Sequence, residues 1–134
     1  MTQNEKDLLL IDICARLPYN VAIDCRDEDS RFTCYLTTDM LREIQNNNHY
    51  WEYKPYLFPL ESMTEEQKNE YHYIVNYISS DDTDNWTEGE FVYVNQTEQL
   101  YHFYHRHHLD YRGLIAKDLA IDATGLRIYE DDEK

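Results

Sequence analysis

Four histidines within a span of seven residues are the side chains best suited to chemistry: His102, His105, His107 and His108. On a helix, His102 and His105 would lie about one turn apart and could share a metal ion with Asp110 or a more distant carboxylate. Zinc ligands on one helix usually stand four residues apart, or come as two separated pairs, and the cysteines lie far away in sequence. Histidines near the C-terminal end of a helix are also favoured by its dipole. We therefore expect structural histidines, with no metal site and no cofactor.

Catalytic motifs are missing from the sequence, which has no G-x-S-x-G, no P-loop, no G-x-G-x-x-G and no H-E-x-x-H. The cysteines Cys14, Cys25 and Cys34 all fall on predicted inward faces, whereas a nucleophilic thiol needs an exposed, electropositive setting. Their odd number, without a C-x-x-C pair, is typical of reduced thiols in a cytosol. We expect no catalytic residues, and an enzyme or a metal-binding protein is the third hypothesis.

The charge of the chain is the most informative property of its composition. With 27 acidic and 12 basic residues in 134, the net charge is −15. Such a charge repels nucleic acid and anionic membranes, and it attracts basic protein surfaces. Acidic residues also favour solubility, which is the plain alternative. The sequence thus predicts no direct nucleic-acid binding, no membrane association, and a basic protein surface as partner.

The position of the charge marks a candidate binding surface, because Lys68 is the single Lys or Arg between Pro55 and His105. The candidate residues lie on a predicted helix and the loop after it: Glu65, Glu66, Glu70, Tyr73, Asp81, Asp82, Asp84, Trp86, Glu88 and Glu90. Carboxylates separated by aromatic rings can take the place of the phosphates and bases of a nucleic acid in a basic groove. A solvated helix face is the alternative, and the helix dipole explains Glu65 and Glu66. It does not explain why balancing Lys and Arg residues are missing.

The first half of the chain predicts a helix, a hairpin and a second helix. The helix Asn4–Leu17 has an apolar stripe and ends at Pro18. Two alternating runs, Val21–Cys25 and Phe32–Leu36, predict a β-hairpin with a polar connection. A short helix then begins at Thr37 or Thr38 and extends to about Gln45.

In the second half, the two prolines of His49–Pro59 predict an edge strand. Thr64 and Gln67 form a predicted capping box, and the helix that follows has an apolar stripe. Its members are Tyr71, Ile74, Val75 and Ile78. A strand at Phe91–Val94 and a helix from Asn95 follow, the latter with Leu100, Phe103, Tyr104 and His107 facing inward. The order of elements predicts an α+β fold, a small antiparallel sheet with about three helices packed on it. Residues 1–129 are expected to form a single domain and 130–134 an acidic tail.

Three blocks of sequence carry a resemblance to a known group of proteins: Cys14–Tyr19, Lys54–Pro59 with Ser62–Glu66, and His107–Ile115 with Leu119–Ile121. In this order they resemble short uncharacterised proteins of Bacteroides-type bacteria and of their phages and mobile elements. The resemblance implies a mobile-element origin and carries no catalytic residues with it.

These observations lead to one main hypothesis for function and one alternative. We expect a non-enzymatic inhibitor that docks its acidic face on the basic groove of a nucleic-acid-binding host protein, as an anti-CRISPR-like counter-defence protein would. The alternative is a structural, assembly or regulatory protein-interaction module of a phage or mobile element. The N-terminal residues lack a signal-peptide pattern and the longest apolar run, Leu8–Ile11, is short, so we expect a cytoplasmic protein.

Overall fold

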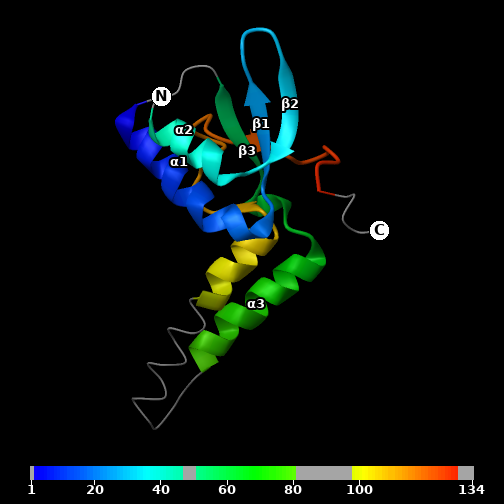
Figure 1. Cartoon of the computed structure of the whole chain (residues 1–134). Coiled ribbons are helices and arrows are strands. Elements are labelled where there is room, and N and C mark those ends of the chain that lie inside the picture. Colours follow the sequence, from blue (N-terminus) through cyan, green and yellow to red (C-terminus); the bar gives the residue numbers. More distant parts are fainter. Residues whose placement is uncertain (1, 47–50, 81–97, 130–134) are drawn as a thin grey trace.

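Helices pack against a small sheet in this computed structural model, which describes residues 2–46, 51–80 and 98–129 (Figure 1). The first half contains helix α1 (Gln3–Arg16), the 3-10 turn η1 (Leu17–Tyr19), strands β1 (Ala22–Arg26) and β2 (Arg31–Tyr35), and helix α2 (Thr38–Gln45). The second half contains β3 (Glu52–Pro59), the 3-10 turn η2 (Leu60–Ser62), helix α3 (Glu65–Ser80), helix 98–106, β4 (Leu109–Asp110) and β5 (Ile121–Asp122). The fold is α+β, as the sequence predicts.

The sheet is mostly antiparallel, with the strand order β2-β1-β3-β4, and β5 also pairs with β3. β1 pairs antiparallel with both β2 and β3. β4 and β5 are two residues long and pair with β3 in parallel. The sequence does not show these parallel pairs, because such short strands carry no alternating pattern.

The expectation that the strand ending at Pro59 lies at the sheet edge is wrong, because β3 pairs with three other strands. Both prolines fall where one pairing ends. Pro55 lies opposite Ile23 in the last pair with β1, and Pro59 lies opposite Asp110 in the last pair with β4. A residue without an N–H is tolerated at such points, since no continuing ladder needs its hydrogen.

Side-chain caps set where the helices begin. At the start of α3, the Gln67 amide donates to Thr64 Oγ1 at 3.1 Å, and the Thr64 amide donates to Gln67 Oε1 at 3.0 Å. This confirms the predicted capping box. Thr37 accepts from the Met40 amide and begins α2, as expected. Thr2 caps α1 in the same way as Thr64 caps α3.

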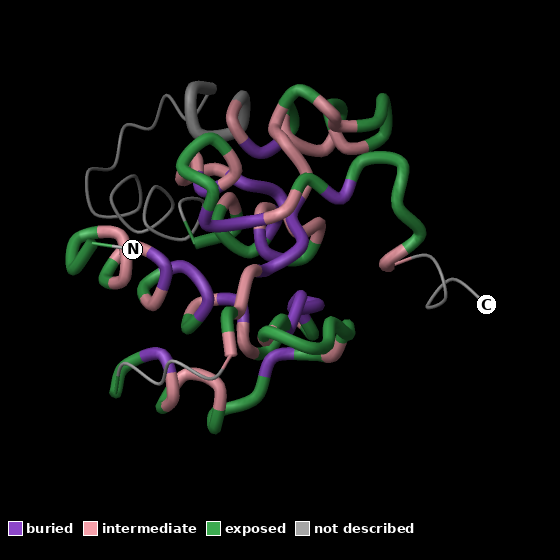
Figure 2. Tube along the Cα trace, turned by 90° about the horizontal axis from the view of Figure 1, so that it is seen from above, coloured by how far each residue is buried: buried purple, intermediate pink, exposed green. Residues whose placement is uncertain are grey.

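The main hydrophobic cluster joins α1 and α2 to β1, β3 and the 114–120 segment, and it includes Leu9, Ile13, Val21, Ile23 and Leu57. β1 is buried on both faces, because Ala22 belongs to a second cluster with Tyr56 and Ala123. The buried positions lie in the interior, while the outer sides of the helices are exposed or intermediate (Figure 2).

A third cluster holds α3 and helix 98–106 together, with Ile74, Phe103 and Leu109 buried in it. Phe103 is completely buried and Ile74 is nearly so, each worth about 1.5–3 kcal/mol of apolar transfer. The predicted inward faces of these two helices are therefore confirmed at their central residues. This pair of helices extends away from the sheet at one end of the molecule (Figure 1).

Two side chains are exposed although the sequence predicts them on inward faces: Cys14, and Phe32, which shares the predicted face of Cys34. Cys14 points to solvent because α1 turns Asp12, Ile13 and Arg16 inward instead. Phe32 keeps 49% of its surface exposed, although its ring contacts Trp51 edge-on. The end of the hairpin where β2 begins projects beyond the described helices (Figure 1).

Some sequence predictions fall outside the described residues, namely the strand Phe91–Val94, the start of the following helix at Asn95, and the acidic tail 130–134. Within the described residues, no helix combines the length and the apolar character needed to cross a bilayer.

Candidate functional site

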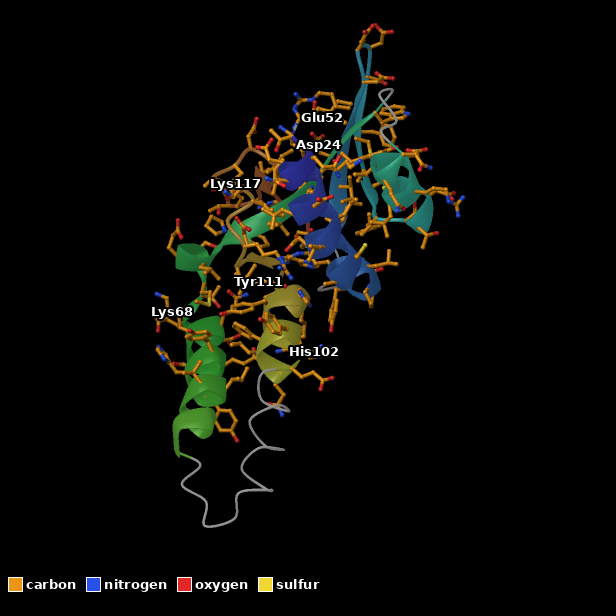
Figure 3. The ribbon with its side chains drawn as sticks, turned by 90° about the vertical axis from the view of Figure 1, so that its left-hand side faces the viewer. Asp24, Glu52, Lys68, His102, Tyr111 and Lys117 are labelled. Carbon is orange, nitrogen blue, oxygen red and sulfur yellow. The ribbon has the colours of Figure 1, made fainter. Side chains whose placement is uncertain are left out.

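The predicted acidic surface begins on the outer side of α3. Glu65 and Glu66 are exposed, and Tyr73 keeps 71% of its surface exposed. Glu66 and Tyr73 are seven residues apart and share one side of the helix. Lys68 lies on the side of α3 turned away from helix 98–106, with its Nζ 3.9 Å from Glu65, and such an exposed pair adds little stability (Figure 3). The remaining members lie outside the described residues: Asp81, Asp82, Asp84, Trp86, Glu88 and Glu90.

Glu70, placed on this surface by the sequence, is instead part of a clamp between two helices. Its carboxylate accepts a hydrogen bond from Arg106 and lies 3.0 Å from His107 Nε2. Burial alone would raise the pKa of Glu70, but the bonds from His107 and Arg106 outweigh burial and lower that pKa. The sequence misses this clamp because Arg106 follows Glu70 by 36 residues. The acidic surface of α3 is therefore smaller than expected, and its exposed carboxylates are those of Glu65 and Glu66.

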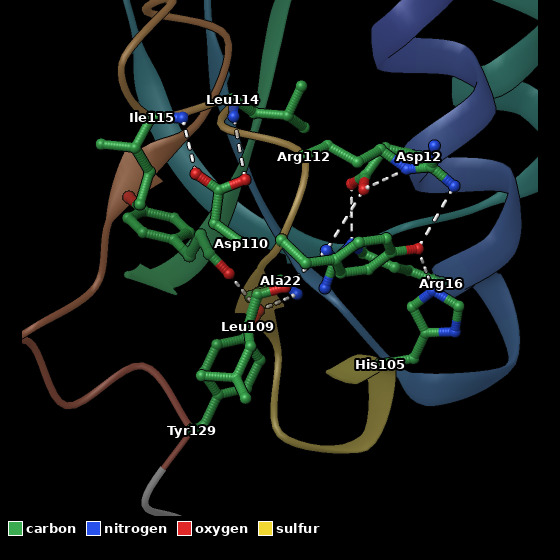
Figure 4. Close-up of polar contacts among 12 residues, drawn as sticks. Asp12, Arg16, Ala22, His105, Leu109, Asp110, Arg112, Leu114, Ile115 and Tyr129 are labelled. Atoms are coloured by element: carbon green, nitrogen blue, oxygen red, sulfur yellow. Dashed lines mark hydrogen bonds and ion pairs between the residues drawn. The ribbon is translucent and has the colours of Figure 1, made fainter. Parts of the chain in front are cut away.

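A buried ionic network joins α1 to the segment 109–112, and none of the predicted site residues belongs to it (Figure 4). Asp12 and Arg16 are completely buried, and Arg16 Nε donates to Asp12 Oδ2 at 2.7 Å. Arg16 Nη2 also donates to the backbone carbonyl of Leu109 at 2.6 Å. Arg112 brings Nε to 3.2 Å from Asp12 Oδ1, close enough for an ion pair but not aligned for a hydrogen bond. The network thus ties α1 to β4 and to the turn after it.

A sequence signal for this network exists. Asp12 and Arg16 stand four residues apart on the same side of α1 as Leu9 and Ile13. Opposite charges placed on the apolar stripe of a helix predict a buried ion pair, since lone buried charges are avoided.

Tyr111 and His105 extend the network toward helix 98–106. The Tyr111 hydroxyl lies 2.7 Å from His105 Nε2 and accepts from Arg112 Nη2 at 3.2 Å. The guanidinium groups of Arg16 and Arg112 lie 5.4 and 5.0 Å from the centre of the Tyr111 ring. These distances are those of cation–π contacts.

The chemistry of this network favours a structural role. Burial, and then the charge of Arg16, lowers the pKa of His105 to about 4. Burial raises the pKa of Tyr111 above its usual value, so this hydroxyl keeps its proton at neutral pH. Acid–base catalysts work best with a pKa near the working pH, and both groups are shifted away from it.

The four histidines between 102 and 108 have separate partners. His102 pairs with the Tyr19 hydroxyl, His107 with Glu70, and the ring of His108 stacks on Tyr129 at 3.8 Å. His105 contacts Tyr111, as described above. In the part of the chain that the structure describes, no three His, Cys, Asp or Glu side chains are arranged to hold a metal ion.

Comparison with known proteins provides no relative, because no family model, no curated protein and no solved structure matches the chain. The resemblance to mobile-element proteins, and the origin that it implies, therefore stay predictions.

Proposed function

We propose that this protein is a non-enzymatic, acidic binding protein that docks on a basic surface of a nucleic-acid-binding protein. The observation that carries the proposal is the net charge of −15, together with exposed carboxylates on α3. Exposed charges of one sign speed the encounter with a surface of opposite sign and select against wrong partners. Binding of this kind needs no cofactor and takes place in the cytoplasm.

The pairing of the cations supports this proposal. Most Lys and Arg side chains in the described residues lie within 4 Å of a carboxylate: Arg16, Arg26, Arg31, Arg42, Lys54, Lys68, Arg106 and Arg112. Most of the described positive charges are thus engaged with the protein's own acids. The acidic excess is left to interact with something outside the chain.

The resemblance to proteins of phages and mobile elements favours one version of this function. The protein would be a counter-defence inhibitor of the anti-CRISPR type, which occupies the guide or target channel of a nucleoprotein effector. In the alternative, a structural, assembly or regulatory module, the basic patch of the partner has no role in nucleic-acid binding. Addition of DNA or RNA distinguishes the two, because only a partner that uses a nucleic-acid channel should be released by it.

Charge reversal on the acidic surface tests the proposal. A variant with Glu65, Glu66, Asp82 and Asp84 changed to Lys should lose partner binding, because like charges facing a basic groove repel it. Glu70 is left unchanged, since its replacement would also loosen the helix pair. The wild-type complex should weaken steeply as salt rises, because exposed charges are screened beyond about 10 Å at 0.1 M.

A matched control reverses four exposed acids on other elements, Asp7, Asp39, Asp118 and Asp122, and should keep most of the affinity. If the first variant binds as tightly as the wild type, the acidic surface is a solvated face. The structural or assembly alternative would then become the leading function.

A further inference from the structure

Two of the three cysteines meet across the β1–β2 hairpin. The Sγ atoms of Cys25 and Cys34 are 3.0 Å apart. In the antiparallel register, Ile23 lies opposite Cys34 and Cys25 lies opposite Phe32, so the two cysteines are diagonal neighbours on one face. A disulfide holds its sulfurs at about 2.05 Å, so an approach of only about 1 Å separates this pair from a bond.

The two thiols differ in how they can react. Cys25 is completely buried, while Cys34 is partly exposed. Burial, followed by the hydrogen bond with Cys34, raises the pKa of the Cys25 thiol to about 12. The thiolate is the nucleophile in disulfide exchange, and the raised pKa keeps Cys25 protonated. The partly exposed Cys34 is therefore the thiol that reacts first with an oxidant from solution. Cys25 is placed to react only with Cys34.

We propose that Cys25 and Cys34 are a redox-modification site that forms a reversible disulfide by exchange with a small disulfide such as glutathione disulfide. The Cys34 thiolate attacks one sulfur of glutathione disulfide, which breaks the S–S bond and releases one glutathione thiolate. Cys25 then gives its proton to a released thiolate, and its sulfur attacks Cys34 Sγ and expels the second glutathione as a thiolate. That thiolate takes up from water the proton that Cys34 released when it ionised. In total, two cysteine thiols are oxidised to a disulfide and one glutathione disulfide is reduced to two glutathione thiols.

The bond would close the hairpin near its turn. Asp27 already orders this turn by accepting from the amides of Asp29 and Ser30, at 2.9 and 2.6 Å. A covalent link between β1 and β2 restricts the unfolded chain, so the oxidised protein should melt at a higher temperature than the reduced protein. The exposed Cys14 lies on α1 and takes no part.

The test uses the full chain with Cys14→Ser, an exposed substitution away from the hairpin. Reduced protein is incubated with glutathione disulfide, alkylated and digested with trypsin, which cuts after Arg26 and Arg31 and so places the two cysteines in separate peptides. We expect peptides 17–26 and 32–42 joined by a disulfide, with no glutathione retained. Dithiothreitol should restore both free thiols.

Further variants establish the order of the steps. Cys25→Ala should trap glutathione on Cys34, whereas Cys34→Ala should leave Cys25 unmodified. In the wild type, glutathione on the exposed Cys14 shows that the oxidant is active. The proposal is overturned if Cys14→Ser protein keeps two free thiols under conditions that modify wild-type Cys14. It is also overturned if glutathione remains on Cys34 while Cys25 stays reduced. These outcomes are read on Cys14→Ser protein and do not depend on how the alanine variants fold.

Discussion

The buried pair of Asp12 and Arg16 illustrates how much a single residue can decide in this protein. Both side chains are fully buried, and the Nη1 nitrogen of Arg16 has no hydrogen-bond partner among the described residues. Arg16 therefore depends on Asp12 and on the Leu109 carbonyl for compensation of its charge. Removal of one partner from such a pair costs about 3–5 kcal/mol, because the other charge is left alone in the interior. The charge of Asp12 thus serves the fold and is not available to a partner protein.

His105 gives a prediction for stability against pH. Burial, and then the Arg16 charge, lowers its folded-state pKa to about 4 from 6.5, so the unfolded chain takes up a proton before the folded protein does. The neutral imidazole contributes fully to the free energy of unfolding above pH 6.5. This contribution is lost as pH falls toward 4. One pKa unit corresponds to about 1.4 kcal/mol, so the loss is on the order of 1–3 kcal/mol. Urea unfolding at a series of pH values measures it.

Variants separate this effect from that of the carboxylates. His105→Gln should flatten the dependence between pH 6.5 and 4, even though loss of the Tyr111 contact lowers stability at every pH. His102→Gln, at an exposed position one turn away, should change the slope less than His105→Gln does, because burial of His105 is the main cause of its low pKa. His108 keeps part of the slope in both variants, because burial also lowers its pKa to about 4. An unchanged slope in His105→Gln would contradict the assignment.

At the scale of elements, the clamp on Glu70 decides how α3 and helix 98–106 stay together. Glu70→Gln removes the charge that Arg106 and His107 share, and we expect the free energy of unfolding to fall by about 0.5–1 kcal/mol, since the pair is partly exposed. Glu66→Gln is the matched control, an exposed residue one turn earlier on the same helix. It should leave stability within about 0.5 kcal/mol of the wild type. Equal losses in chemical denaturation would show that the clamp contributes nothing.

The helices and strands differ in how well the sequence predicts them. Local signals were sufficient for the capping box of Thr64 with Gln67, for the hairpin, and for the limits of α1 and α2. The site was predicted less well, because the surroundings of Glu70 depend on Arg106, a residue that only the tertiary fold brings near. The edge position predicted for β3 is wrong for a similar reason. Its partners β4 and β5 are too short to show an alternating pattern in the sequence. The sequence thus predicts local structure, and it does not predict contacts between segments that are far apart in the chain.

For the molecule as a whole, the distribution of charge matters more than any one pair. Nine of the 27 acidic residues lie in 81–97 and 130–134, and the other 18 lie in the described residues. Three of the described acids, Asp12, Asp24 and Asp110, are buried and engaged within the fold. The remaining surface acids exceed the basic residues, most of which are already paired. A basic partner would therefore meet a negative field from several directions, with α3 as the proposed contact.

This protein should not bind nucleic acid. Among the described residues, Arg26 and Arg31 are two exposed cations that lie opposite each other in the hairpin. Both lie within 4 Å of Asp24, and the turn between them adds exposed Glu28 and Asp29. Affinity for DNA and RNA comes mainly from cations that replace counterions at phosphates, and these two arginines already lie beside a carboxylate.

We expect no retarded band in gel-shift assays with DNA or RNA at about micromolar protein, even at low salt, where such contacts are strongest. Asp24→Asn is the informative variant, because it frees both arginines. If weak, salt-sensitive binding appears in the variant alone, then the pairing of Arg26 and Arg31 with Asp24 prevents the hairpin from binding phosphates. Binding by the wild-type protein would contradict the electrostatic argument, and with it the proposal that the acidic surface seeks a basic protein partner.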